Sequence, residues 1–145
     1  MSIGRRGAMQ VSLGALLCLA TPLRAQDILA PPNSATLEDV IAAFSDGSSI
    51  RDGSVTVTLP EIAEDGYRVS VQVSAPEATE ILLVAPGNPV MPVLRAKFGP
   101  TAGAARVSTR MRLAQTQDVL VLARMPDGSI QKDLKPVSVI VGGCA

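Results

Sequence analysis

The sequence contains no histidine and no tryptophan, and its aromatic residues are limited to Phe44, Tyr67 and Phe98. Without histidine, the chain cannot form a Ser-His-Asp triad, a Cys-His pair, a His-ligated metal site or a local attachment motif for c-type haem. Three aromatic rings are too few for the stacking platforms that bind single-stranded nucleic acid. Basic and acidic residues both number 13, so there is no basic excess to favour nucleic acid. These absences argue against acid–base catalysis near neutral pH and against binding of nucleic acid. Since the sequence also shows no metal-ligand constellation and no nucleotide-binding loop, we predict a protein that is not an enzyme and has no cofactor or metal.

Residues 1–25 show the three-part pattern of a secretory signal peptide. Arg5 and Arg6 form a basic start, an apolar stretch follows, and Ala25 supplies the small residue before the cleavage point. The apolar run of about fifteen residues is shorter than the ~20 that a spanning helix needs, so we expect no membrane anchor. The paired arginines resemble a twin-arginine export signal, although Gly4 and Ala8 depart from its usual pattern. We therefore predict export to the periplasm and favour the twin-arginine route, with the general secretory route as the alternative.

Cleavage after Ala25 would leave ten basic and thirteen acidic residues, a side-chain balance of −3. It would also remove Cys18 and leave Cys144 as the single cysteine in a compartment that favours disulfides. A lone cysteine in an exported chain is buried, pairs with another chain, or is a working thiol.

The remaining sequence is long enough for one domain, which we divide into residues 26–53, 54–141 and 142–145. Apolar residues at 37, 40, 41 and 44 predict a helix over 36–44, with Thr36 and Asp39 placed as in a capping box. From residue 54 the apolar period changes to two, with turn residues between the segments. The expected strands cover 54–59, 68–73, 81–85, 93–98, 106–113, 118–125 and 136–141, with a short piece at 129–131. This pattern predicts an all-β, immunoglobulin-like antiparallel β-sandwich with one short N-terminal helix and a flexible C-terminal arm.

The C-terminal residues form the strongest candidate site. Gly142 and Gly143 lack the β-carbon that restrains backbone angles, so they predict a hinge directly before Cys144. The sequence places no base or cation beside this thiol, which argues against a thiol enzyme. A terminal arm can instead enter the active sites of other proteins. The alternatives are a frayed terminus with an incidental cysteine and an exported interaction module that uses Cys144 for an inter-chain disulfide.

Internal stretches make a family resemblance specific. The chain resembles the SoxY family, the sulfur-carrier subunit of the periplasmic thiosulfate-oxidising (Sox) system. The resemblance is carried by residues 59–66 (LPEIAEDG), 87–89 (GNP), 107–117 (VSTRMRLAQTQ), 125–129 (MPDGS) and 142–144 (GGC), in this order.

This resemblance implies an immunoglobulin-like carrier that forms a heterodimer with a second β-sandwich subunit, SoxZ. It implies that Cys144 takes up thiosulfate covalently through a c-type cytochrome complex, and that a hydrolase then releases sulfate. Gly142 and Gly143 would form the arm. Ala145 stands where the family has two further glycines, which leaves open a specialised paralogous carrier that serves fewer partners.

Three arginines alternate along one predicted strand, at Arg106, Arg110 and Arg112. On a strand they would share one face and could steer thiosulfate or an acidic partner. An ordinary solvated face explains the same pattern.

Overall fold

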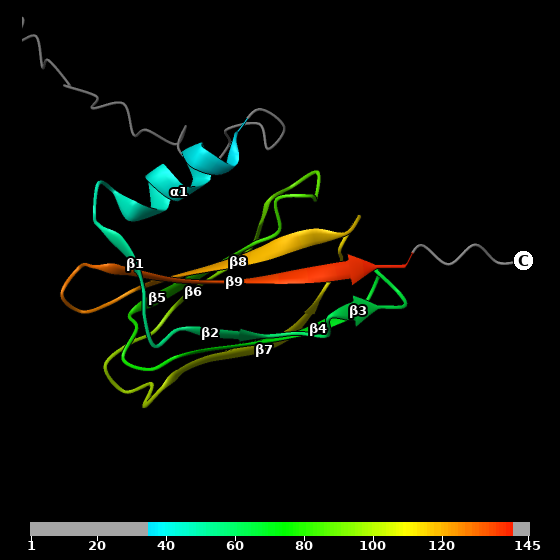
Figure 1. Cartoon of the computed structure of the whole chain (residues 1–145). Helices are drawn as coiled ribbons and strands as arrows, with labels where there is room; N and C mark the ends of the chain where they lie inside the picture. The colour runs from blue at the N-terminus through cyan, green and yellow to red at the C-terminus, as the bar shows by residue number, and fades with distance from the viewer. Residues whose placement is uncertain (1–34, 141–145) are drawn as a thin grey trace, which may run out of the picture. The chain divides into compact units, whose positions relative to one another are not determined.

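The computed structural model describes residues 35–140 and shows two β-sheets packed face to face, with one helix on the outside (Figure 1). The elements are α1 (Leu37–Ser45), β1 (Ile50–Asp52), β2 (Thr56–Thr58), β3 (Ile62–Ala63), β4 (Val69–Ala75), β5 (Glu80–Val84), β6 (Pro92–Lys97), β7 (Ala105–Met111), β8 (Gln117–Arg124) and β9 (Ile130–Val139). The six-stranded sheet has the order β1-β9-β8-β5-β6, with β3 paired to β9, and the three-stranded sheet has the order β2-β4-β7. The predicted all-β, immunoglobulin-like sandwich is thereby confirmed.

The main core lies between the two sheets and follows from the alternating sequence. In β4, the side chains of Val69, Val71 and Val73 are buried, and the residues between them face outward. The inner face of the other sheet contributes Ile81, Leu83 and other residues, all from alternate positions of its strands. Both sheets thus bury one apolar face each, which is the physical basis of a sandwich.

A second, smaller core lies on the outer face of the six-stranded sheet, where α1 covers part of it (Figure 1). The capping box is present: the Asp39 amide donates to the Thr36 hydroxyl, and the Thr36 amide donates to the Asp39 carboxylate. Phe44, at the end of the helix, is 2% exposed and packs with the buried residues of this core. These are Leu82, Val84, Leu120, Leu122 and Ile130. The amphipathic helix is therefore held by burial of its apolar stripe.

A charged cluster fastens the helix to the sheet around Glu80, whose side chain is 8% exposed. Arg95 donates to the Glu80 carboxylate at 2.6 Å, and Arg124 lies 3.6 Å from it. Arg124 also donates to the Phe44 carbonyl, and both guanidinium groups lie over the Phe44 ring, at 5.6 and 5.1 Å from its centroid. Burial alone would raise the pKa of Glu80, but the Arg95 hydrogen bond and the charges of Arg95, Lys97 and Arg124 lower it below its ordinary value. Glu80 is thus an ionised carboxylate that links three elements.

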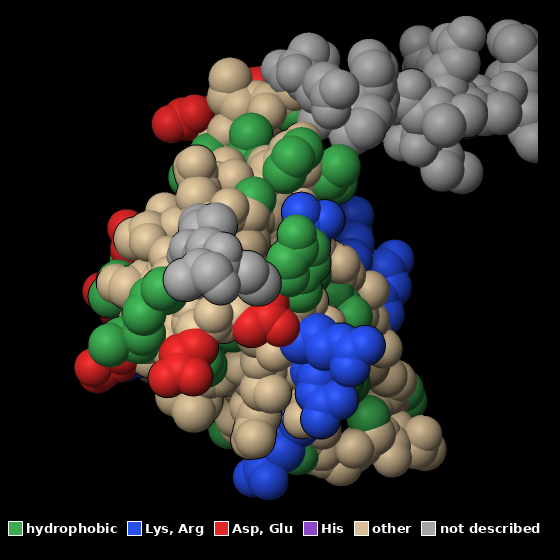
Figure 2. Space-filling model, turned by 90° about the vertical axis from the view of Figure 1, so that its right-hand side faces the viewer, with side chains coloured by type: hydrophobic (Ala, Val, Ile, Leu, Met, Phe, Trp, Pro, Cys, Tyr) green, Lys and Arg blue, Asp and Glu red, His purple; other side chains and the backbone are tan. Residues whose placement is uncertain are grey.

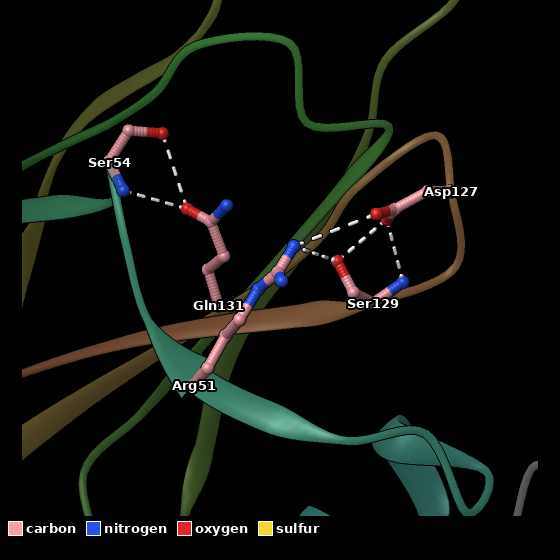
Figure 3. Close-up of polar contacts among 5 residues, drawn as sticks. All are labelled: Arg51, Ser54, Asp127, Ser129 and Gln131. Carbon is pink, nitrogen blue, oxygen red and sulfur yellow. Dashed lines mark hydrogen bonds and ion pairs between the residues drawn. The ribbon is translucent and has the colours of Figure 1, made fainter.

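Two short strands were missed by the sequence analysis, and both pair in parallel with β9, so the sandwich is not wholly antiparallel. Strand β1 follows the helix, and its Arg51 donates to Ser129 at 3.1 Å and lies 3.6 Å from Asp127 in the turn before β9 (Figure 3). Next to it, the Ser54 amide donates to the Gln131 side chain at 2.8 Å (Figure 3). Side-chain contacts between the β1 segment and the start of β9 thus hold this edge of the sheet. Such contacts leave no periodic pattern in the sequence, so the sequence analysis could not predict β1.

Strand β9 also joins two predicted pieces, 129–131 and 136–141, into one strand that includes Pro136. The amides of Ile130 and Ser138 donate to Ser49 and Glu61, on the side of β9 that faces β1 and β3. Backbone amides point to alternate sides along a strand, and Pro136 is an even number of residues from both Ile130 and Ser138. The N–H that Pro136 lacks would therefore point to the side of β1 and β3, between these two short strands, and not to β8, so the β8–β9 pairing loses no hydrogen bond.

Candidate functional site

The predicted site residues Gly142, Gly143 and Cys144 lie outside the described residues, as do the predicted signal peptide and the last residue of the predicted 54–141 segment. The structure does describe the point from which the C-terminal residues start. The Val139 amide donates to the Thr116 hydroxyl and the Ile140 amide to the Ala63 carbonyl, both at 2.9 Å. Ile140 is therefore fixed to β3, four residues before Cys144. Because a fully extended chain spans at most ~3.6 Å per residue, the Cα atoms of Ile140 and Cys144 can be at most about 14 Å apart.

A cavity of about 320 Å³ lies beside this anchor and includes Ile140 in its lining. The Arg112 guanidinium lies 4.7 Å from the centroid of the Tyr67 ring, and Tyr67 is 69% exposed. Glu64 and Asp65 line the same cavity, so its walls carry both signs of charge. Neither Tyr67 nor this cavity was identified from the sequence, because only the fold brings 64–67 next to 112–114 and 139–140.

Glycine is required at one position of this cavity. A β-carbon on Gly66 would lie 2.5 Å from the Leu113 carbonyl and 2.9 Å from a methyl of Val139. The Leu113 amide donates to the Gly66 carbonyl at 2.8 Å, which holds the two segments together. The turn before β4 therefore packs directly on the segment after β7 and on the end of β9.

The arginines that the sequence placed on one face are exposed in the structure. Arg106 and Arg110 extend from β7 opposite Ser74 and Ser70 of β4, and Arg112 follows the end of β7. Arg68, which the sequence analysis did not group with them, precedes β4 at the same end of the sheet and is also exposed. The alternation with Val69 could have assigned it to this face. Seen from the end where β9 finishes, the basic side chains lie on the right and the acidic ones on the left (Figure 2).

Residues 35–140 contain no cluster of three or more His, Cys, Asp and Glu residues that could hold a metal ion. Within the same range, no helix is both long and apolar enough to cross a membrane.

The fold and the chain's path from β9 define an immunoglobulin-like β-sandwich whose predicted reactive residue follows its last strand. Comparison with known proteins narrows this class. The family model "Sulfur oxidation protein SoxY" matches residues 41–144, a range that ends at Cys144. The chain therefore belongs to the SoxY family.

Solved structures agree with this assignment. The sulfur carrier protein SoxY from Chlorobium limicola f thiosulfatophilum is 31% identical, with a TM-score of 0.65, and the match covers 73% of this chain and 97% of that one. A superoxide reductase (neelaredoxin) from Ignicoccus hospitalis has a TM-score of 0.53 at 20% identity, covering 61% and 81% of the two chains, which shows the shared sandwich fold alone. No match was found among the curated proteins.

Proposed function

We propose that this chain is a sulfur carrier that holds thiosulfate-derived groups covalently on Cys144 and presents them to the enzymes of the Sox system. The observation that carries this proposal is the family match over residues 41–144, because it includes the GGC segment as well as the sandwich. Membership of the family supports a carrier role in sulfur oxidation, and a 31% identical relative is described as a sulfur carrier protein.

The loading step joins the Cys144 sulfur to the outer sulfur of thiosulfate. The thiolate and thiosulfate together lose two electrons, which pass to a c-type cytochrome complex, and a cysteine S-thiosulfonate remains. A hydrolase then adds water across the bond between sulfur and the sulfonate, which releases sulfate and two protons and leaves a persulfide on the cysteine. The carrier supplies a nucleophile and a position, and its partners supply the oxidant and the hydrolytic site.

Gly142 and Gly143 form the arm of the proposed carrier. Two residues without β-carbons allow many backbone conformations. The arm would start from Ile140, whose amide is bonded to the Ala63 carbonyl, so that the cysteine could enter a partner's active site while the sandwich stays outside it. In this proposal, the length and backbone flexibility of the arm deliver the cysteine, and the surfaces of the sandwich are recognised by the partner proteins.

The test measures loading of Cys144 by intact mass after incubation with thiosulfate and the cytochrome complex. We expect Cys144→Ser to abolish the mass increase while the thermal midpoint stays unchanged. A Gly142→Pro/Gly143→Pro variant keeps the thiol and should load much more slowly, because proline restricts the backbone. Loading on the Ser variant would disprove the assignment of Cys144. A stable inter-chain disulfide in every preparation, with no sulfur adduct, would favour the interaction module instead.

We further propose a heterodimer with a SoxZ-like β-sandwich subunit. On the outer face of β9 and β3, beyond the residues covered by α1, three apolar side chains are more than half exposed: Ile62 at 59%, Leu134 at 51% and Ile140 at 53%. Permanent interfaces are more apolar than transient ones, so this apolar strip fits a constant partner. A Leu134→Asp variant should elute as a monomer when mixed with the partner subunit, whereas the original chain should elute as a complex. Equal elution of both would disprove this placement.

The export route is likewise a proposal. The signal pattern supports cleavage after Ala25 and a periplasmic location. The mass of the mature chain should begin at Gln26, and Arg5→Lys/Arg6→Lys should retain the precursor in the cytoplasm if export uses the twin-arginine route.

A further inference from the structure

The outer face of the three-stranded sheet has an unusual composition. Its strands expose only hydroxyl, amide and guanidinium side chains, while the chain after residue 25 is acidic overall. None of the twelve Asp and Glu residues between 35 and 140 extends from β2, β4 or β7. Four of the ten Lys and Arg residues in that range belong to this face or its end. We call these four residues, Arg68, Arg106, Arg110 and Arg112, the arginine face.

The pairing of arginines differs between the two sheets. Arg51, Arg95 and Arg124, on the six-stranded sheet, each lie within 4 Å of a carboxylate. Among the described residues, no carboxylate oxygen lies within that distance of any guanidinium of the arginine face. These like charges on one face repel each other slightly. Apart from the contact of Arg112 with the Tyr67 ring, the structure of residues 35–140 shows no charge or ring beside them that would compensate for this repulsion, which favours a binding partner outside the chain.

The arginine face also runs toward the proposed reactive residue. Arg106 and Arg112 are six residues apart along β7 and its end, which is about 20 Å of extended strand. Arg112 lines the same cavity as Ile140, from which Cys144 is four residues away. A partner protein bound to the arginine face would therefore extend to the cavity beside Ile140, close to where the arm begins.

We propose that the arginine face is the docking surface for an acidic surface patch on the enzymes that act on Cys144. This inference rests on the proposed carrier function. The charges are spread along a strand and exposed, and no buried donor converges on one point, so the face fits an extended acidic protein surface better than a single small anion such as thiosulfate. Docking by exposed charges gives fast and reversible association, which a carrier that visits several enzymes requires.

The experiment measures the second-order rate constant for loading of the heterodimer by the cytochrome complex, at ionic strengths from about 10 mM to about 200 mM, where screening becomes strong. The test variant is Arg106→Gln/Arg110→Gln, which does not touch the cavity beside the arm. One control, Arg51→Gln/Lys97→Gln, removes the same charge from the other sheet. A second control, Arg106→Lys/Arg110→Lys, keeps the charge of the face.

We expect the test variant to load about tenfold more slowly than the original chain at low salt and to lose most of the salt dependence. The rates of the two should converge at high salt, and both controls should stay close to the original chain. The proposal is overturned if the test variant and the Arg51→Gln/Lys97→Gln control have equal rates and salt slopes. It is equally overturned if only the KM for thiosulfate changes, or if the test variant no longer forms the heterodimer.

A binding measurement separates this proposal from the carrier function. Immobilised Cys144→Ser chain cannot be loaded, but it should still bind the cytochrome complex in a salt-dependent way that Arg106→Gln/Arg110→Gln weakens. Salt-dependent binding without any loading of the original chain would disprove the carrier function and leave the docking surface standing. Normal loading of the original chain with no effect of the arginine substitutions would disprove the docking surface and leave the carrier function standing.

Discussion

The two outward faces of the sandwich show how one fold serves two purposes. The outer face of the six-stranded sheet buries Leu82, Leu120 and Leu122 under α1, and its guanidinium groups are neutralised by carboxylates. The outer face of the three-stranded sheet buries nothing, and its guanidinium groups have no carboxylate partner among the described residues. The first face contributes to the stability of the fold, whereas the charges of the second face are available to bind a partner. Substitutions on the two faces should therefore differ in their effect on the free energy of unfolding, and this difference tests the comparison.

The largest expected effect is on the covered face. Leu120 is 4% exposed, and its cross-strand neighbour Leu134 is 51% exposed. Leu120→Ala should lower the free energy of unfolding by about 2–4 kcal/mol, because it leaves a cavity in the core under α1. Leu134→Ala makes the same chemical change and should cost less than about 0.5 kcal/mol in the isolated chain. Urea unfolding of both variants measures this, and equal losses would contradict the division between covered and exposed residues.

The Glu80 cluster should produce the next largest effect. Glu80→Gln removes the charge that the guanidinium groups of Arg95 and Arg124 share, so it should cost about 1–3 kcal/mol. Asp133→Asn, at a half-buried carboxylate, tests whether loss of any carboxylate charge has this effect. Asp133 accepts hydrogen bonds from the amides of Val57, at 2.7 Å, and Leu134, at 2.9 Å. A smaller loss for Glu80→Gln than for Asp133→Asn would show that the cluster does not fasten the helix.

The same cluster predicts a dependence of stability on pH. The pKa of Glu80 in the folded chain is lowered from 4.5, so its ionised form is favoured by folding. Its contribution is present above the unfolded pKa and is lost as the pH falls through the folded pKa, that is, below about 4.5. Unfolding followed by circular dichroism from neutral to acidic pH should show this loss. Glu80→Gln should flatten the curve in part, because the pKa values of Asp39 and Asp127 are lowered too.

A smaller effect is expected at the start of the helix. Thr36→Ala removes the hydroxyl that accepts from the Asp39 amide and should cost about 1 kcal/mol. Thr36→Ser keeps the acceptor and serves as the control, so it should stay near the original stability. If the Ala and Ser variants unfold at the same urea concentration, the capping box does not contribute to stability.

The smallest effect on stability is expected on the arginine face. Arg110→Gln should change the free energy of unfolding by less than about 0.5 kcal/mol, since the side chain is exposed and makes no ion pair with the described residues. A loss comparable to that of Glu80→Gln would show that this face contributes to folding after all. Comparison of the two variants in one urea titration gives the most direct contrast between the faces.

The sequence predicted β2, β4 and β7 because their residues alternate between core and solvent. It predicted β5 because that strand is a continuous apolar run, buried on both faces. It missed Ile50–Asp52, all of whose residues are exposed, and Ile62–Ala63, which is too short to show a period. It also divided β9 at 131 and 136, because Pro136 and the exposed Leu134 hide the pattern there. Short strands that pair with the edge of another strand and bury few side chains show no alternation of apolar and polar residues. A local sequence pattern could therefore not predict them.

The buried Glu80 was likewise invisible from the sequence, because a glutamate before an apolar run looks like a solvated strand end. Its cations are spread over β6 and β8, at Arg95, Lys97 and Arg124, and only the pairing of these strands with β5 brings them together. The same holds for Tyr67 and Arg112 beside Ile140, which meet only because Gly66 allows a close approach to Leu113.

The sequence by itself determined the sandwich, the capped helix, the family and the GGC segment, since alternation, capping residues and motifs are local properties of the chain. Within residues 35–140, only the tertiary structure decided which arginines lie beside a carboxylate and which do not. It also decided which apolar side chains α1 covers and which stay exposed. Those outcomes depend on charges and surfaces from strands far apart in the sequence, and their energies arise only at the distances that sheet pairing and packing impose.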